Sequence, residues 1–259
     1  MIGRRPPVGL LLPAACALAL IVIPLAALLQ HAPWGSLATQ LASDDVRTAL
    51  RLSIECSILA VAVSMVVGVP LAWMLARSTF PGKSLVRALV TLPMVLPPVV
   101  GGVALLLAFG AHGFAGQALS HVGITLPFTT AGTVVAETFV AMPFLVIAVE
   151  AGLRQADVRL EEAAATLGAR PWARFWRVTL PLIAPSLAAG AALTWARALG
   201  EFGATITFAG NLPGTTQTMP LAVYVALESD TDGAIALSLL LLAVSLVVLI
   251  GLRDRWLGT

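Results

Sequence analysis

Residues 161–181 read EEAAATLGARPWARFWRVTLP, a polar, alanine-rich segment set between two long apolar stretches. Glu161 and Glu162 stand early in it, where carboxylates favour the start of a helix. Ala163–Ala165 favour helix strongly, and Gly168 is a natural C-terminal stop. We predict a helix of about three turns, too polar to cross a membrane. An amphipathic connector lying on lipid headgroups has the same pattern.

The composition is that of a membrane protein. Hydrophobic residues make up 59% of the 259 positions and charged residues 11%, against about 25% charged residues in a soluble domain. Mean hydropathy is +0.96. The net charge of +2 is carried by small arginine groups near the ends of apolar runs, which gives no indication of nucleic-acid binding. We predict a single all-α integral membrane domain over residues 1–259, surrounded by lipid.

Six apolar stretches are long enough to cross a bilayer, which takes about 20 residues per helix. They cover residues 8–30, 50–76, 86–110, 131–153, 182–206 and 233–252. The first span, 8–30, is longer than the apolar core of a typical signal peptide, so we predict that it is retained. Two polar loops separate the later spans. They are 154–181 and 207–232. In the second, Met219 to Glu228 are predicted to form a short helix that lies on the outer surface.

The distribution of basic residues predicts the orientation. With the N-terminus in the cytoplasm, twelve of the fifteen Lys and Arg residues fall inside: Arg4, Arg5, Arg77, Lys83, Arg87, Arg154, Arg159, Arg170, Arg174, Arg177, Arg253 and Arg255. Only Arg47 and Arg51 fall outside, and Arg197 lies within a span. Because basic residues concentrate in cytoplasmic loops, we predict that both termini and the loop 154–181 are cytoplasmic, and that 207–232 is external.

Two stretches of the chain are alike. Residues 91–97, TLPMVLP, match 179–185, TLPLIAP, and Gly102 and Gly190 follow at the same offset. A second proline one turn after the first kinks or loosens a helix unless neighbouring groups satisfy the freed carbonyl. Two interpretations remain open: two independent helix starts, or two equivalent halves that line one pathway.

The polar loop also carries a family pattern. Glu162-Ala163-Ala164, then Gly168, Val178 and Leu180-Pro181, resemble the EAA loop of ABC-transporter importer permeases, in which isoleucine is usual at the position of Val178. The resemblance implies a type I ABC importer permease fold, with this loop as a coupling helix seated in a groove of an ATPase subunit. The coupling residues it implies are Glu161, Glu162, Ala163, Ala164 and Gly168.

A downstream segment narrows the resemblance. Residues 196–205, ARALGEFGAT, are similar to molybdate and sulfate permeases, and 209–222 are similar to the molybdate branch. The implied function is ATP-driven import of molybdate across a prokaryotic cytoplasmic (inner) membrane. Sulfate, thiosulfate or tungstate permeases of the same type are the near alternatives. A proton-coupled secondary transporter is the alternative from another class.

The partners follow from the resemblance. They are a second permease copy, two ATPase subunits that carry ATP and Mg, and an external oxyanion-binding protein. Residues Gly82-Lys83-Ser84 look like the end of a phosphate loop, but Arg77 stands where that motif requires glycine. We therefore predict no nucleotide site, cofactor, metal or catalytic residue in this chain.

The fifth span holds the candidate pathway or gate residues. Arg197 and Glu201 are four residues apart, so they share a helix face and either pair with each other or serve a gate or an anion. Gly200 and Gly203 permit close helix approach, and Thr205 and Thr207 offer hydroxyl donors. The turn-rich loop that follows is the candidate docking site for the delivery protein, and its candidate residues are Asn211, Gly214 and Gln217.

Overall fold

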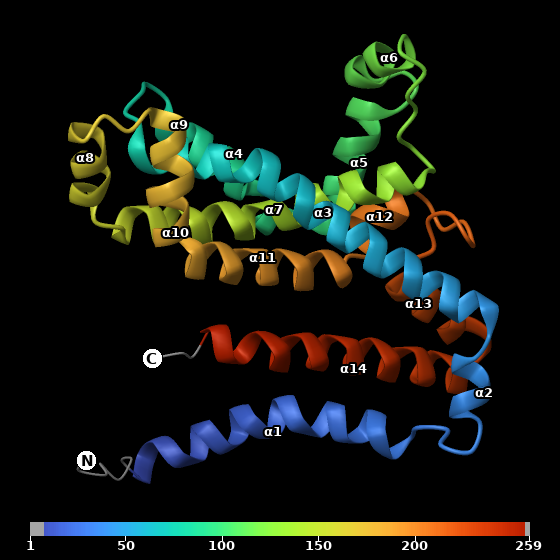
Figure 1. The fold of residues 1–259 in the computed structure, drawn as a ribbon. Coiled ribbons are helices and arrows are strands. Elements are labelled where there is room, and N and C mark those ends of the chain that lie inside the picture. The colour runs from blue at the N-terminus through green and yellow to red at the C-terminus, as the bar shows by residue number, and fades with distance from the viewer. Residues whose placement is uncertain (1–7, 257–259) are drawn as a thin grey trace.

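The structure, a computed structural model, describes residues 8–256 and is all-helical over that range (Figure 1). The longer helices are α1 (Val8–Gln30), α3 (Asp44–Arg77), α7 (Thr130–Gln155), α11 (Ala184–Leu199) and α14 (Thr231–Trp256). The short helices and the π-helix η1 complete the chain: α2 (Leu37–Leu41), α4 (Lys83–Val95), α5 (Pro98–Phe109), α6 (Phe114–Ser120), α8 (Val158–Thr166), α9 (Pro171–Arg174), η1 (Phe175–Thr179), α10 (Leu180–Leu182), α12 (Gly203–Phe208) and α13 (Met219–Ser229).

Four helices are long and apolar enough to cross a membrane, and two bent pairs raise the number to six. The first pair is α4 with α5, bent by 118°, and the second is α9–α10 with α11, bent by 74°. The predicted spans 86–110 and 182–206 are therefore not straight helices. The second of them also breaks after Leu199 and resumes as α12. About six spans in an all-α fold is confirmed.

The core forms around α7, which packs against α3 on one side and α11 on another. Leu75, Leu145 and Ile183 are fully buried where these three helices meet. A second layer of the same contact contains only alanines, Ala60, Ala141 and Ala198. Small side chains let helix backbones approach closely, which suits packing inside a bilayer.

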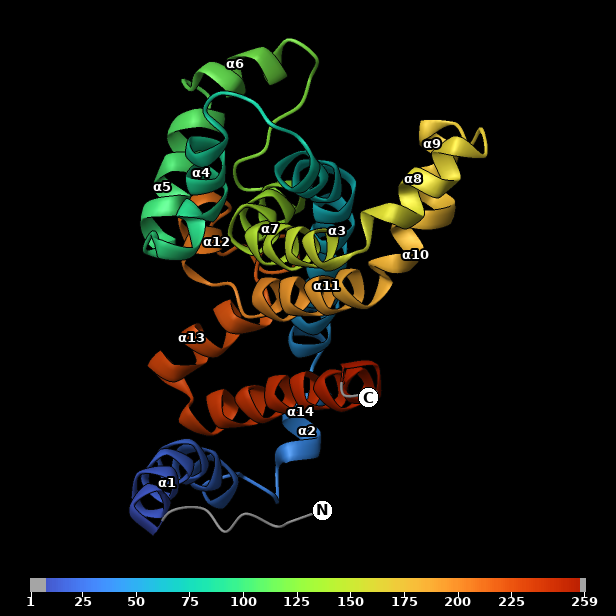
Figure 2. The ribbon, with the colours of Figure 1, turned by 90° about the vertical axis from the view of Figure 1, so that its left-hand side faces the viewer.

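The elements outside this core lie on different sides of it. In Figure 2, α8 and α9 project from the bundle on the side opposite α5 and α6. Helix α1 lies against α14, and none of the residues in its most apolar stretch is buried within the chain. In Figure 1, α1 begins and α14 ends at the side of the molecule where α8 lies.

Candidate functional site

Helix α8 has the beginning and the end that its sequence predicts. The Asp157 carboxylate accepts a hydrogen bond from the Arg159 backbone N–H at 3.0 Å and caps the first turn. Gly168 has φ +83°, the left-handed conformation that glycine adopts without strain. Next to it, the Ala169 N–H donates to the Ala164 carbonyl at 3.0 Å, which closes the last turn. The predicted helix and its glycine stop are confirmed.

The outer face of α8 is open to solvent. Glu162, Ala163 and Gly168 are exposed, and Ala164 is half-buried. Leu167, beside the glycine, is 88% exposed. An acidic group next to uncovered apolar side chains is a surface suited to a partner that brings both a cation and an apolar groove.

Glu161 lies on the other face of the same helix. Its carboxylate accepts a hydrogen bond from Arg77 Nη2 at 2.9 Å, and both side chains are largely buried. Arg77 is the last residue of α3, 84 positions away. The two neighbouring acids therefore differ: Glu162 is available to a partner, whereas Glu161 attaches α8 to the bundle. No local pattern signals a contact between residues so far apart in sequence.

An aromatic cluster lies between α8 and the bundle. The ring centroids of Trp172 and Phe175 are 6.1 Å apart, and Trp176 is 5.7 Å from each of the other two. Both tryptophans are more than half exposed. Tryptophan is enriched at membrane–water interfaces, so the three aromatics indicate that α9 and η1 lie at that level. Three aromatic residues within five positions could have indicated this interface from the sequence, although no prediction was based on them.

A second group of ion pairs holds α4 on α7. Arg87 and Arg154 both donate to Glu150 Oε1, at 2.5 and 2.6 Å, and the Glu150 side chain is largely buried. The Glu150 carboxylate of α7 thus binds Arg87 of α4, and Arg154 of α7 shares the same oxygen. No local sequence pattern indicates that two arginines share Glu150, because Arg87 is 63 positions away.

Arg197 and Glu201 pair although the helix between them ends. The Arg197 Nη2 to Glu201 Oε2 distance is 2.7 Å, and the Glu201 side chain is fully buried. Glu201 Oε1 also accepts from the Ala204 N–H at 2.8 Å. The pair therefore bridges the break between α11 and α12 rather than lying on one continuous helix, and it satisfies a free N–H at the start of α12.

The predicted small and hydroxyl residues take different positions. A Cβ on Gly203 would lie 2.7 Å from Pro98 Cβ, so the backbones of α12 and α5 are in close contact there. Gly200 is exposed, with no such neighbour. The Thr207 hydroxyl donates to the Gly203 carbonyl at 2.7 Å and is not free. The Thr205 hydroxyl is buried and has no hydrogen-bond partner among the groups that the structure describes.

The loop 211–217 is ordered against the start of α7. The Thr216 hydroxyl accepts from the Leu212 N–H at 2.9 Å, and the Thr130 hydroxyl donates to the Thr215 carbonyl at 2.9 Å. Gly214, with φ +75°, is exposed, while Asn211 and Gln217 are half-buried. Of the three predicted docking residues, only Gly214 presents itself fully at the surface of this chain.

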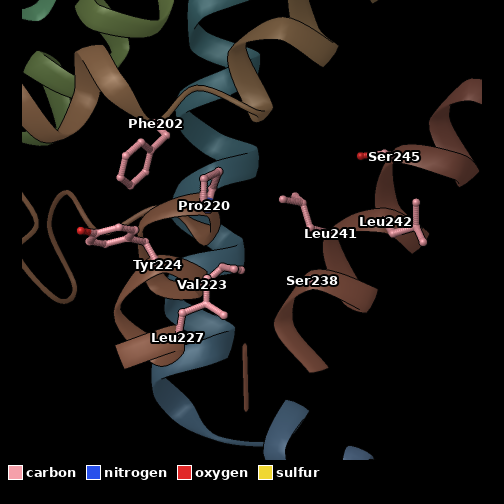
Figure 3. Close-up of a pocket in the computed structure, with 9 residues that line it drawn as sticks. All are labelled: Phe202, Pro220, Val223, Tyr224, Leu227, Ser238, Leu241, Leu242 and Ser245. Carbon is pink, nitrogen blue, oxygen red and sulfur yellow. The ribbon is translucent and has the colours of Figure 1, made fainter. Parts of the chain in front are cut away.

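An apolar hollow of about 500 Å³ adjoins the α11–α12 break (Figure 3). Phe202 and Tyr224, with ring centroids 5.1 Å apart, form one wall. Leu241 of α14 faces them across the hollow, and Ser238 and Ser245 add two hydroxyl groups. Among the described residues, no group of His, Cys, Asp or Glu is placed to hold a metal ion.

This architecture, with broken spans and a polar helix projecting from one side, is that of a type I ABC importer permease. A model of the family described as "Binding-protein-dependent transport system inner membrane component" matches residues 68–256. The chain belongs to this family. It is a multi-pass inner-membrane transport subunit, and separate subunits carry the ATPase activity.

Named relatives match almost the whole chain. The molybdenum transport system permease protein ModB of Mycobacterium tuberculosis is 45% identical over 244 residues, 94% of this chain and 92% of that protein. ModB of Escherichia coli is 42% identical over 83% of this chain and 95% of its own length. The E. coli sulfate permease CysT is 37% identical over 90% of this chain and 86% of its own.

A solved structure shares the fold. The crystal structure of a bacterial ABC transporter that imports the acidic polysaccharide alginate contains a chain that superimposes with a TM-score of 0.76 at 20% identity. The match covers 95% of this chain and 93% of that chain. The resemblance to importer permeases, drawn from the EAA loop and residues 196–222, is confirmed.

Proposed function

We propose that this chain forms the translocation pathway of an ATP-driven importer for molybdate. The observation that carries the proposal is the 45% identity to a molybdenum permease over 94% of the chain, together with the exposed EAA helix α8. The 37% identity to a sulfate permease keeps sulfate, thiosulfate and tungstate importers as the nearest alternatives.

Energetics explain why such a permease needs an ATPase. Molybdate is a dianion, and moving two negative charges into a cell costs about 4.6 kcal/mol per 100 mV of interior-negative potential. A passive pore would let the anion leave again. Two ATPase subunits with ATP and Mg supply the work, and a second permease copy completes the pathway. An external oxyanion-binding protein delivers the anion, with the 211–217 loop as its docking site.

The exposed face of α8 is the proposed contact with the ATPase. Glu162 offers a charge to a basic residue of the partner, and Ala163, Ala164 and Leu167 offer a close apolar contact. This requires α8 in the cytoplasm, as the arginine and lysine distribution predicts. The position of α8 at the side where α1 begins and α14 ends is consistent with both termini being cytoplasmic (Figure 1).

The proposed gate is the break between α11 and α12. Arg197 and Glu201 hold the two helices at a fixed angle, and the exposed Gly200 leaves room for the second copy at the same level. The Thr205 hydroxyl is fully buried, so a passing oxyanion would reach it only after α12 moves. We assign the ion pair a structural role in the gate. If a charge reversal at Arg197 left transport intact, Arg197 would have no part in conducting the anion.

The coupling role of α8 is tested with a double variant, Glu162→Ala with Gly168→Ala, in the complete transporter. We expect loss of ATP-driven uptake with the protein still in the membrane. The variant removes the charge offered to the ATPase and strains the helix end at φ +83°. Asp45→Ala, an exposed acid at the start of α3, is the control and should transport normally. Normal uptake by the double variant would exclude the coupling role.

The substrate is tested by uptake into vesicles that contain the permease, its ATPase and the delivery protein. Labelled molybdate should enter only with ATP, and excess sulfate or thiosulfate should compete weakly. Sulfate uptake without molybdate uptake would move the protein to the sulfate branch. Uptake by the permease alone, driven by a pH gradient, would instead support a proton-coupled secondary transporter.

A further inference from the structure

Helix α8 is covalently attached to the bundle by a short extended link on one side and by interrupted helices on the other. Before it, Ala156 and Asp157 form a two-residue link from α7, and both have extended backbone angles. After it come the turn at Gly168, four residues of α9, the π-helix η1 and the break at Ile183. Breaks and π-turns are places where a helix bends. A single short tether on one side lets a helix pivot, so neither link alone fixes how α8 is oriented.

The contact between Glu161 and Arg77 supplies a second point of attachment. Arg77 Nη2 donates to Glu161 Oε1 at 2.9 Å, and the side chains are 15% and 13% exposed. Helix α8 otherwise packs mainly on α9 and η1, which belong to the same loop. The ion pair is therefore the side-chain hydrogen bond that joins α8 to a different membrane-spanning helix within the described residues.

The helix that receives this contact is suited to carry a movement inward. Helix α3 is a single helix of 34 residues, with Pro70 inside it, and ends at Arg77. Three turns or less before that end, Val69, Ala72 and Leu75 are buried in the core that α3 forms with α7 and α11. A displacement of Arg77 would thus reach the centre of the bundle through packed side chains, which transmit strain because they leave little free space.

We propose that Arg77 and Glu161 are a positioning pair, which orients α8 on the bundle and passes its movement to α3. The proposal rests on the function of α8 proposed above. In this arrangement the two acids of the EAA loop have different roles. Glu162 faces the ATPase, and Glu161 holds the helix to the permease. Movement then enters the bundle by two routes, through α3 and through α10 into α11.

The test is a charge swap in the complete transporter, with uptake and ATP hydrolysis measured on the same vesicles. Arg77→Glu and Glu161→Arg each place like charges together, and we expect anion uptake per ATP to fall about tenfold in each. The double variant restores opposite charges and should recover uptake per ATP to within about threefold. ATP hydrolysis should persist in all three, because Glu162 and the outer face of α8 are unchanged.

The same helix offers a matched control. Arg51 and Glu55 form an ion pair of 2.6 Å near the other end of α3, and both side chains are exposed. The corresponding single and double reversals there should leave uptake per ATP unchanged, since exposed pairs contribute little. Where a reversal lowers the amount of protein in the membrane, Glu161→Gln keeps the side-chain volume and should still lower uptake per ATP severalfold.

Three results would overturn the positioning role. The first is normal uptake per ATP in both single reversals and in Glu161→Gln. The second is a double variant no better than the singles, because each residue would then act without the other. The third is an equal loss at Arg51 and Glu55. A failure of the underlying function is distinguishable, since wild-type vesicles would then show no ATP-driven uptake, or the Glu162 and Gly168 variant would remain coupled.

Discussion

The stretches 91–97 and 179–185 share four of seven residues, including both prolines, and break in different ways. The first covers the end of α4 and the two residues before α5, and these helices are bent by 118°. The second covers the end of η1, helix α10 and the start of α11, and the bend there is 74°. In the first, Leu96 and Pro97 both have extended backbone angles. In the second, Ile183 alone interrupts the helix, with φ −96° and ψ 3°.

One position next to the break distinguishes the two stretches. A residue that precedes proline is disfavoured in the helical region. Pro97 is followed by Pro98, so residues 96 and 97 both precede a proline, whereas Pro185 is followed by Ser186. Two consecutive extended residues turn the chain further than one interrupted turn does. The repeated pattern therefore predicts that each helix breaks, and we infer that the residue after it contributes to how far the chain turns.

The surroundings of the two stretches differ as well. Arg87, on the helix before the first break, is fixed to α7 through Glu150. Among the side chains that the structure describes, residues 9–248 and 250, the arginines before the second break form no ion pair, and that segment leads out to α8. We infer that the bent pair α4–α5 is fixed in place, and we call it the anchored arm. We infer that the bent pair α9–α11 can move, and we call it the movable arm. The predictions below test this contrast.

The largest effect is expected for Gly102→Ala. A Cβ at Gly102 would lie 2.6 Å from Thr207 Cβ and 2.9 Å from the Ala204 carbonyl oxygen, so backbone of α12 has to move. We expect a loss of about 3 kcal/mol in unfolding free energy, at the upper end for overpacking, and loss of most uptake. Unfolding of the purified protein in mixed SDS micelles measures the stability.

Gly101→Ala is the matched control for Gly102. Its Cβ would meet the Phe139 ring edge at 3.1 Å and no backbone. We expect a loss of less than about 1 kcal/mol, because a side chain can shift. Equal losses at the two glycines would contradict the tight contact between α5 and α12.

The next effect is expected for Glu150→Gln. This change leaves the guanidinium groups of Arg87 and Arg154 without their carboxylate, and it should lower the unfolding free energy by about 2 kcal/mol. Arg177→Gln, on the movable arm, removes an exposed charge and should change it by less than about 0.5 kcal/mol. The same micelle titration compares the two. A larger loss at Arg177 would reverse the assignment of anchored and movable arms.

Much of the local structure could be predicted from sequence because the signals are local. The carboxylates and alanines of 157–165 and the stop at Gly168 predict α8 within a few residues. The prolines predict where two spans break. Arg197 and Glu201 were expected to be near each other from their spacing, and they pair even though α11 ends between them.

The rest depends on contacts between distant segments. Nothing near Glu161 distinguishes it from Glu162, and its role appears only when Arg77 arrives from 84 positions away. Thr207 looked like a free donor, but inside a helix its hydroxyl donates to the Gly203 carbonyl, four residues earlier. Gly200 and Gly203 looked equivalent, and only the packing of α5 on α12 separates them.

A smaller effect is expected for Gly190→Ala, at the position that matches Gly102. Its Cβ would lie 3.0 Å from Ala148 Cβ, 3.1 Å from Leu145 Cδ1 and 3.3 Å from Leu145 Cα, all in α7. Because these contacts are longer than the 2.6 Å contact at Gly102, we expect a loss of about 1 kcal/mol in the same titration. Gly190 proving more sensitive than Gly102 would show that the closer helix contact lies on the movable arm.

The smallest effect on stability, and the most direct test of the comparison, is expected for Pro98→Ser. This change gives the first break the residue that the second has at Ser186, and it frees Pro97 from the restriction that a following proline imposes. We expect less than about 1 kcal/mol of change in unfolding free energy, since Pro98 is exposed and contributes mainly by limiting the unfolded chain. The bend between α4 and α5 should instead decrease from 118° toward the 74° of the second pair, and spin labels on Leu85 and Leu107, both exposed, would report the change in distance.

Pro93→Ala is the control, because Pro93 lies within α4 and not at the break. An unchanged distance in Pro98→Ser would mean that the packing of α5 on α12, and not the proline pair, sets the angle of the anchored arm.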